Sequence, residues 1–175
     1  MEEFLKSVEK KAFKMIQIAT GQTDDSLDLL QDCMMAFVRK YSDKSKSEWK
    51  PLFYRVVQNR IRDWYRHERL KKLFFISNQR RETGPDGEND PIESIEDHRA
   101  VDSLTALKAA RAMEKLNDVI KQLPARQQQV FLLRSWEGLN TKETARAMGC
   151  TEGSVKTHYS RAVIKLRQEL EGTWP

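Results

Sequence analysis

The sequence predicts an all-α protein made of two small helical domains joined by a flexible acidic linker. Apolar residues recur every three or four positions along most of the 175 residues, whereas the alternation typical of strands is hard to find. Residues 82–102 break this pattern with eight acids and one base, a net charge of −7, among two glycines and two prolines. Such a stretch has little to bury. It divides the chain into a first domain over 1–76, a linker over 77–103 and a second domain over 104–175.

Three helices are expected in the first domain, enough to close a small bundle. The first ends before Gly21, and its apolar residues at helical spacing are Phe4, Val8, Ala12, Met15, Ile16 and Ala19. The second carries acids at its start and Arg39 and Lys40 at its end, as the helix dipole favours. Its apolar stripe is Leu27, Leu30, Met34, Phe37 and Tyr41.

The third helix should run from about Pro51, which a first turn tolerates, to about Lys72. Its expected stripe is Leu52, Val56, Asn59/Arg60 and Asp63/Trp64. Aromatic residues lie among its arginines, which is what a single-stranded nucleic acid needs, since each stacked base contributes ~1–3 kcal/mol. For Phe53 and Tyr54 a place in the core is the better interpretation. For Trp64 and Tyr65 core and base stacking stay equally open.

In the second domain the helical pattern resumes near Leu104, with apolar positions at Leu107, Ala110, Met113, Leu116, Ile120 and Leu123. Pro124 marks a new helix start, and Gly138 ends that helix. Two short helices then flank Gly149. Thr141 is expected to cap the first and Thr151 the second. The pair has the chemistry of a helix-turn-helix, in which the second helix enters the DNA major groove.

The second short helix carries the side chains that such a motif uses on DNA. Lys156, Thr157, Ser160 and Arg161 fall on or near one face, and His158 lies beside it. Lysine and arginine can bond guanine O6 and N7, while hydroxyls suit phosphates or bases. A helical hairpin without a DNA role would show the same local spacing, so this pattern needs independent support.

The charge distribution gives that support. The net charge is +5, but residues 49–72 carry eight lysines or arginines against two acids, and residues 140–167 carry six against two. Two basic patches on separate domains, with the acid gathered between them, indicate two contacts on one long polyanion. The alternative is that both are solvated basic faces.

An acidic face precedes the first basic patch. Asp28, Gln31 and Asp32 are spaced so that they share one side of the second helix, off its apolar stripe. They either stabilise the helix N-terminus in solvent or form a surface for a partner.

Enzyme chemistry has little support in the sequence. The three histidines (His67, His98 and His158) are scattered, and no glycine-rich phosphate loop or metal-ligand spacing occurs. We therefore expect no catalytic residues, no cofactor and no metal. Two distant cysteines, Cys33 and Cys150, favour a reducing compartment. Without a signal peptide or an apolar run of ~20 residues, a cytoplasmic location is expected.

Two blocks of sequence resemble the extracytoplasmic-function sigma factors of bacterial RNA polymerase. Residues 123–167, from "LPARQQQVFLLRSWEGL" through "GSVKTHYSRAVIKLR", are similar to sigma region 4. Upstream, "LDLLQDCMMAFVRKY" and "LFYRVVQNRIRDWYRHE" are similar to sigma region 2. The chain departs from the family pattern at Leu52, where tryptophan is usual, at Thr144, where isoleucine is usual, and at Thr157-His158, where Ser-Arg is usual.

The resemblance implies a role for each surface. The −35 duplex would be read by Lys156, Thr157, His158, Ser160 and Arg161. The −10 element would be opened and held by Asn59, Arg62, Trp64, Tyr65 and Arg66. Asp28, Gln31 and Asp32 would meet the β′ clamp helices of core RNA polymerase.

The resemblance also implies partners. They are core polymerase, including its β flap, promoter DNA and an anti-sigma factor, with the free protein a monomer that does not insert into membranes. The main alternative is an autonomous helix-turn-helix regulator that binds duplex DNA without polymerase. A helical adaptor that binds only protein is a further alternative, and the two basic patches count against it.

Overall fold

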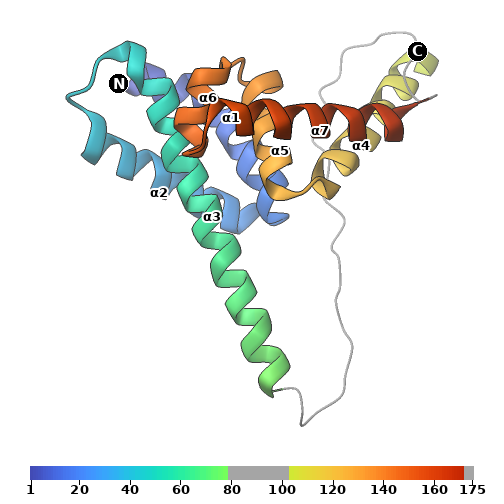
Figure 1. The fold of residues 1–175 in the computed structure, drawn as a ribbon, viewed down its shortest axis with the longest axis horizontal. Helices are drawn as coiled ribbons and strands as arrows, with labels where there is room; N and C mark the ends of the chain where they lie inside the picture. The colour runs from blue at the N-terminus through green and yellow to red at the C-terminus, as the bar shows by residue number, and fades with distance from the viewer. Residues whose placement is uncertain (79–102, 172–175) are drawn as a thin grey trace.

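The computed structural model describes residues 1–78 and 103–171, and every regular element in these two ranges is helical, which confirms the all-α prediction. In chain order the elements are α1 (Glu2–Thr20), α2 (Thr23–Tyr41), α3 (Lys46–Asn78), α4 (Ser103–Gln122), α5 (Ala125–Phe131), the π-helix η2 (Leu132–Trp136), α6 (Thr141–Met148) and α7 (Glu152–Leu170). The predicted linker lies almost wholly outside the described residues. Figure 1 shows that α3 is the longest element and that its C-terminal half projects from the body of the molecule.

The first three helices pack around an aromatic centre. Phe37 lies with its ring centroid 5.6 Å from that of Phe4 and 5.5 Å from that of Phe53, the latter edge-to-face. Trp49 closes the cluster 5.6 Å from Phe4. Such geometries add to the free energy of area burial. Phe53 and Tyr54 are both fully buried, so their prediction as core residues is confirmed.

The buried face of α3 differs from the predicted stripe. Leu52 and Val56 are half-buried and Asn59 is exposed. Over residues 46–71 the buried positions are Trp49, Pro51, Phe53, Tyr54, Val57, Gln58 and Ile61. The predicted stripe was too narrow. Leu52 and Val56 do pack against the core, but α3 is covered on more than one side, so its buried arc is wider than that of a surface helix.

Two other predicted core positions are also wrong. Leu27 on α2 and Met113 on α4 have the expected helical spacing, yet each is 52% exposed. Periodicity identifies the apolar face of a helix, but it does not say how far along that face a neighbour extends. Cys33, which lies among these helices, is fully buried.

The second domain opens with α4 and turns at Pro124 into α5, as the sequence predicts. The end of α5 then widens into the π-helix η2. There the backbone N–H of Glu137 donates to the carbonyl of Leu132, five residues earlier, at 3.0 Å. Such π turns are uncommon and gather at functional positions. Gly138 follows with φ of 69°, which a residue with a side chain adopts at a cost.

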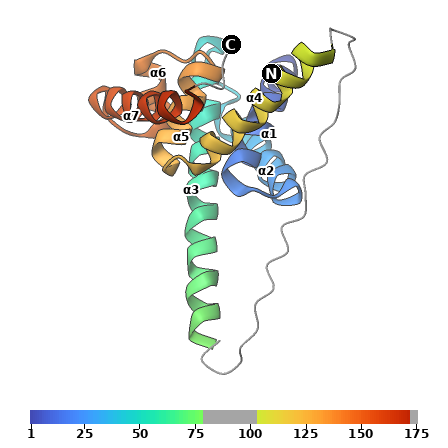
Figure 2. The ribbon, with the colours of Figure 1, turned by 90° about the vertical axis from the view of Figure 1, so that its right-hand side faces the viewer.

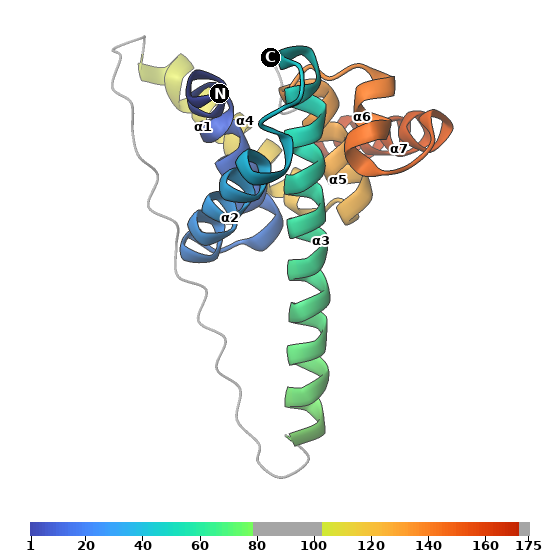
Figure 3. The same cartoon turned by 90° about the vertical axis from the view of Figure 1, so that its left-hand side faces the viewer.

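The helices of the two predicted domains pack directly against each other. Figures 2 and 3 show α3 lying between α1 and α2 on one side and α5, α6 and α7 on the other. Apart from Ala112, the buried apolar side chains among the described residues belong to one continuous cluster. The sequence predicted two domains but gave no indication of this contact.

Candidate nucleic-acid interface

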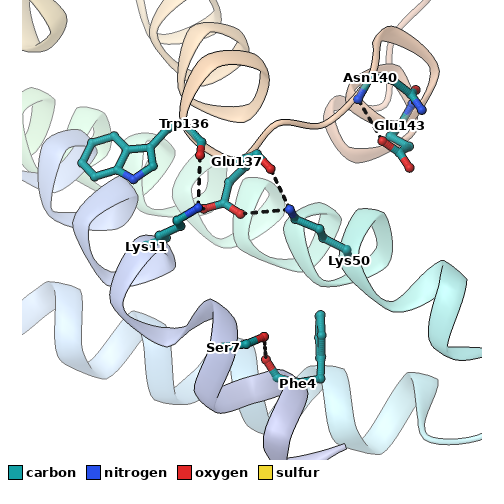
Figure 4. Close-up of polar contacts among 8 residues, drawn as sticks. All are labelled: Phe4, Ser7, Lys11, Lys50, Trp136, Glu137, Asn140 and Glu143. Carbon is teal, nitrogen blue, oxygen red and sulfur yellow. Dashed lines mark hydrogen bonds and ion pairs between the residues drawn. The ribbon is translucent and has the colours of Figure 1, made fainter.

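The helix-turn-helix is held by an N-terminal capping box on α6. The Glu143 N–H donates to Asn140 Oδ1 at 2.9 Å, and the Asn140 N–H donates to Glu143 Oε2 at 2.8 Å (Figure 4). The predicted cap, Thr141, is therefore wrong by one residue, because Thr141 is already the first helical residue. Asn140 with an acid three residues later is a capping-box pattern that could have been found in the sequence.

The turn between α6 and α7 follows the prediction. Gly149 adopts φ of 62°, and the Cys150 N–H donates to the Ala145 carbonyl at 3.1 Å. Thr151 then caps α7, its Oγ1 accepting from the Ser154 N–H at 3.2 Å. Val155 is buried, so the start of α7 is held against the domain core. The opposite side of α7 is therefore presented outwards.

Thr144, which stands where the family pattern has isoleucine, is fully buried in α6. Its hydroxyl donates to the Asn140 carbonyl, one turn earlier, at 2.8 Å. A buried hydroxyl with this bond incurs no cost of an unmade hydrogen bond. The departure therefore leaves the motif intact.

Four of the five predicted −35 residues form one exposed face on α7: Lys156, Thr157, Ser160 and Arg161. Thr157 Oγ1 donates to the Gly153 carbonyl at 3.0 Å, which leaves its lone pairs outward as acceptors. His158 differs, since it is half-buried and its Nδ1 is covered by protein and has no hydrogen-bond partner among the described residues. The structure thus brings four of these side chains together and turns the fifth inward.

The predicted −10 residues lie on the middle of α3. Asn59, Arg62 and Arg66 are exposed, whereas Trp64 and Tyr65 are half-buried. The two rings meet edge-to-face with centroids 5.3 Å apart. Because both rings are only partly exposed, the choice between core packing and base stacking stays open for Trp64 and Tyr65.

The tryptophan of this pair is anchored from the neighbouring helix. Trp64 Nε1 donates to Asp25 Oδ2 on α2 at 3.0 Å. Burial raises the pKa of the adjacent Tyr65 phenol above its ordinary value. The phenol therefore stays neutral at physiological pH and can donate a hydrogen bond.

On the acidic face of α2, Asp28 and Gln31 are exposed and Asp32 is half-buried. Asp32 Oδ2 lies 3.9 Å from Arg60 Nη2 on α3, so one of the three acidic-face residues is already paired inside the domain. This surface also has an apolar part that was not predicted, in which Leu27, Met35 and Val38 are all exposed. Their spacing with Gln31 places them on one side of α2.

Neither a metal centre nor a membrane span is found in the part of the chain that the structure describes. Residues 1–78 and 103–171 contain no group of three or more metal-ligating side chains. No helix in these ranges is long and apolar enough to cross a bilayer.

Burial raises the pKa of the Cys33 thiol to about 12, so that thiol is inert at neutral pH.

Comparison with known proteins identifies the family. Residues 113–166 match the family described as Sigma-70, region 4. Over 176 residues the chain is 31% identical to the RNA polymerase sigma-E factor of Streptomyces avermitilis, covering 97% of this chain and 84% of that one. This chain belongs to the extracytoplasmic-function sigma factors.

Two solved structures share the fold. The sigma factor RpoE of Bartonella quintana, solved in complex with the anti-sigma factor NepR, superposes with a TM-score of 0.64 at 19% identity, covering 98% of this chain and 99% of that one. CnrH, in complex with the cytosolic domain of CnrY, gives a TM-score of 0.59 at 17% identity over 97% and 86% of the two chains. At these identities the likeness concerns the fold alone.

Proposed function

We propose that this sigma factor binds core RNA polymerase and directs promoter-specific initiation, with α7 reading the −35 duplex and α3 holding the −10 element. The observation that carries the proposal is the exposed face of Lys156, Thr157, Ser160 and Arg161 at the start of α7. It lies on a helix whose start is capped by Thr151 and anchored by buried Val155. A rigid helix end that presents cations and hydroxyls is what major-groove reading requires.

For the −10 element, α3 offers arginines beside half-exposed rings. Arg62 and Arg66 can neutralise backbone phosphates while a flipped base stacks on the open side of Trp64 or Tyr65. Asn59, exposed one turn before Arg62, can donate and accept hydrogen bonds at base edges. The hydrogen bond from Trp64 to Asp25 holds its ring in place before DNA arrives.

For core polymerase, α2 offers Asp28 and Gln31 at its exposed acidic face, with Leu27 and Met35 along the same side of the helix. An apolar strip flanked by acids suits a basic, amphipathic helical partner such as the β′ clamp helices. An anti-sigma factor is proposed as a further partner, supported by the complex of RpoE with the anti-sigma factor NepR in which one structural neighbour was solved.

The decisive test is run-off transcription. The purified chain is mixed with bacterial core polymerase and fragmented genomic DNA from its source, and the 5′ ends of the transcripts are sequenced. We expect discrete starts that share two upstream elements. The triple variant D28A/Q31A/D32A should lose these starts, because it removes the polymerase contact and leaves α7 untouched.

A matched pair on α7 tests the −35 assignment. Arg161→Ala removes a cation from the reading face, whereas Arg167→Ala removes an exposed cation two turns further along the same helix. Only R161A should weaken or shift the upstream element, since one lost base contact costs about 1–3 kcal/mol. Equal effects of the two substitutions would count against the proposed face.

An autonomous regulator remains the second candidate, because the α7 face is exposed in the chain without any partner. It predicts tight sequence-specific retention of duplex fragments by the chain alone. The sigma-factor proposal predicts specific retention only with core polymerase. Gel-shift measurements with and without core polymerase therefore separate the two.

A further inference from the structure

A row of polar side chains on α3 faces the second domain. Lys50, Tyr54, Gln58 and Arg62 follow one another at intervals of four residues, which places them on a single ridge of the helix. Three of them donate hydrogen bonds to the second domain: Lys50 to the Glu137 carbonyl at 2.6 Å, Gln58 to Gln129 Oε1 at 2.9 Å and Arg62 to the Met148 carbonyl at 3.4 Å. We call these four residues the polar ridge.

Glu137 is the central residue on the other side of the contact. Its side chain is only 2% exposed, and its carboxylate lies 3.8 Å from Lys11 Nζ and 3.6 Å from Lys50 Nζ (Figure 4). Both lysines belong to the first domain. The first domain therefore supplies the cations that make the burial of this charge tolerable, since a buried unpaired carboxylate is strongly unfavourable.

The same lysines also satisfy the backbone at the end of η2. Lys11 Nζ donates to the Trp136 carbonyl at 3.2 Å, while Lys50 Nζ donates to that of Glu137. Carbonyls at a helix C-terminus lack intrahelical partners and carry partial negative charge. The end of η2 and the Glu137 carboxylate thus form one negative site, filled by two cations from the other domain.

Deeper in the contact, a chain of glutamines crosses between the domains. Gln58 Nε2 donates to Gln129 Oε1 at 2.9 Å, Gln129 Nε2 to Gln128 Oε1 at 3.0 Å, and Gln128 Nε2 to the Ile120 carbonyl at 3.0 Å. All three glutamines are buried. Separating the domains would break the hydrogen bond between Gln58 and Gln129 and leave these amides without their partners. The contact therefore has a defined register set by hydrogen bonds, in addition to its apolar packing.

We infer that the free chain holds itself closed through the polar ridge of α3 and the buried Glu137, and that this contact must break before the two promoter elements can be bound together. The closure is a property of the free chain, while its inhibitory consequence rests on the proposed function. By their numbering, the −10 and −35 elements lie about 25 base pairs apart. At ~3.4 Å per base pair this separation is roughly 85 Å. In the closed chain α3 packs on α6, the first helix of the −35 reader. Two packed helices have axes only about 8–10 Å apart.

The closed contact also engages a proposed −10 residue. The Arg62 guanidinium donates a hydrogen bond to the carbonyl of Met148, the last residue of α6. The nitrogen that donates this hydrogen bond is not free to bind a phosphate until the two domains separate. The exposed reading face of α7 is unaffected. Closure should therefore block combined promoter binding and leave the −35 surface available.

Small-angle X-ray scattering of the full-length chain, without polymerase, tests the closure. At low salt the wild type should be compact, whereas Glu137→Lys, which sets a third cation against Lys11 and Lys50, should have a clearly larger radius of gyration. Glu9→Lys carries the same charge change on an exposed part of α1 and should stay compact. Raising the salt should expand the wild type, because it screens the half-exposed lysines.

A second variant guards against simple misfolding of the second domain. Lys11→Met with Lys50→Met alters only the first domain and would leave Glu137 without a cation in the closed state. Both helices keep long, unbranched side chains, so helical content by circular dichroism should be unchanged while the radius of gyration rises. A wild type as expanded as these variants, or variants as compact as the wild type, would overturn the inference.

Binding of a promoter fragment that carries both elements, measured in the presence of core polymerase, tests the consequence. If nine in ten free chains are closed, opening should tighten the apparent Kd for the fragment about tenfold, because affinity scales with the competent fraction. E137K and K11M/K50M should then bind the fragment more tightly than the wild type and E9K. Opened variants that bind it no more tightly than the wild type would refute the inhibitory role. No specific binding by any of the four proteins would instead refute the proposed function and leave the scattering result standing.

Discussion

Replacing Tyr54 by phenylalanine is expected to stabilise the folded chain. Tyr54 is fully buried beside Glu137, and its hydroxyl makes no hydrogen bond of good geometry among the described residues. Burial first, and then the charge of Glu137 and the contact of its carboxylate with the hydroxyl, raise the pKa of this phenol far above its ordinary value, so the ring is neutral at any physiological pH. An unsatisfied buried polar group costs about 1–3 kcal/mol. Removing one oxygen leaves only a small void, so Y54F should raise the free energy of unfolding by about 1 kcal/mol.

Urea denaturation followed by circular dichroism measures this change, and a thermal melt should show a rise of about 2–4 °C for a chain of this size. Tyr159→Phe is the matched control with the opposite expected sign. The Tyr159 hydroxyl lies 3.0 Å from Ser135 Oγ in a hydrogen bond, so its loss should cost about 0.5–1.5 kcal/mol. If Y54F instead destabilised the chain by 1 kcal/mol or more, its hydroxyl must bond Glu137, and the reasoning would be refuted.

Three further predictions concern the framework of the two domains. Asn140→Ala should destabilise the chain by about 1 kcal/mol through loss of the capping box, and Thr141→Ala should cost much less; equal losses in urea titrations would contradict the assigned cap. Gly149→Ala should cost about 1–2 kcal/mol because φ is 62° there, and a neutral effect in the same assay would mean that the turn relaxes. The raised pKa of Cys33 favours the neutral thiol in the folded state, so stability should be full below pH 9.0 and fall as pH rises from 9.0 towards about 12. Cys33→Ala should flatten this alkaline loss, and wild-type and variant stability profiles of equal slope would argue against it.

The helices and the reading motif could be predicted because they rest on local chemistry. Gly149 is the residue that a left-handed turn favours, and Thr151 is a preferred N-cap, so the α6–α7 pair is visible in the sequence alone. The aromatic centre was also predictable in part, since Phe53 and Tyr54 follow a tryptophan on one helix. Where prediction failed, as at Leu27 and Met113, the missing information was the extent of the neighbouring helix.

The sequence also offered a signal that was not used. Lys50, Tyr54, Gln58 and Arg62 repeat every four residues, but a polar ridge on a basic helix looks the same whether it meets solvent, nucleic acid or protein. Only the packed structure shows that its partner is the chain's own second domain.

Amino-acid order alone thus determined the helical class, the capped helix-turn-helix and the basic character of α3 and α7, because these follow from spacing and neighbouring residues. The tertiary structure decided which polar residues are buried and against what. Glu137 reads as an ordinary acid in a turn, yet lysines 126 and 87 positions away in sequence make it the centre of the contact between domains. Long-range pairing of this kind depends on how two surfaces dock, and local spacing carries no information about it.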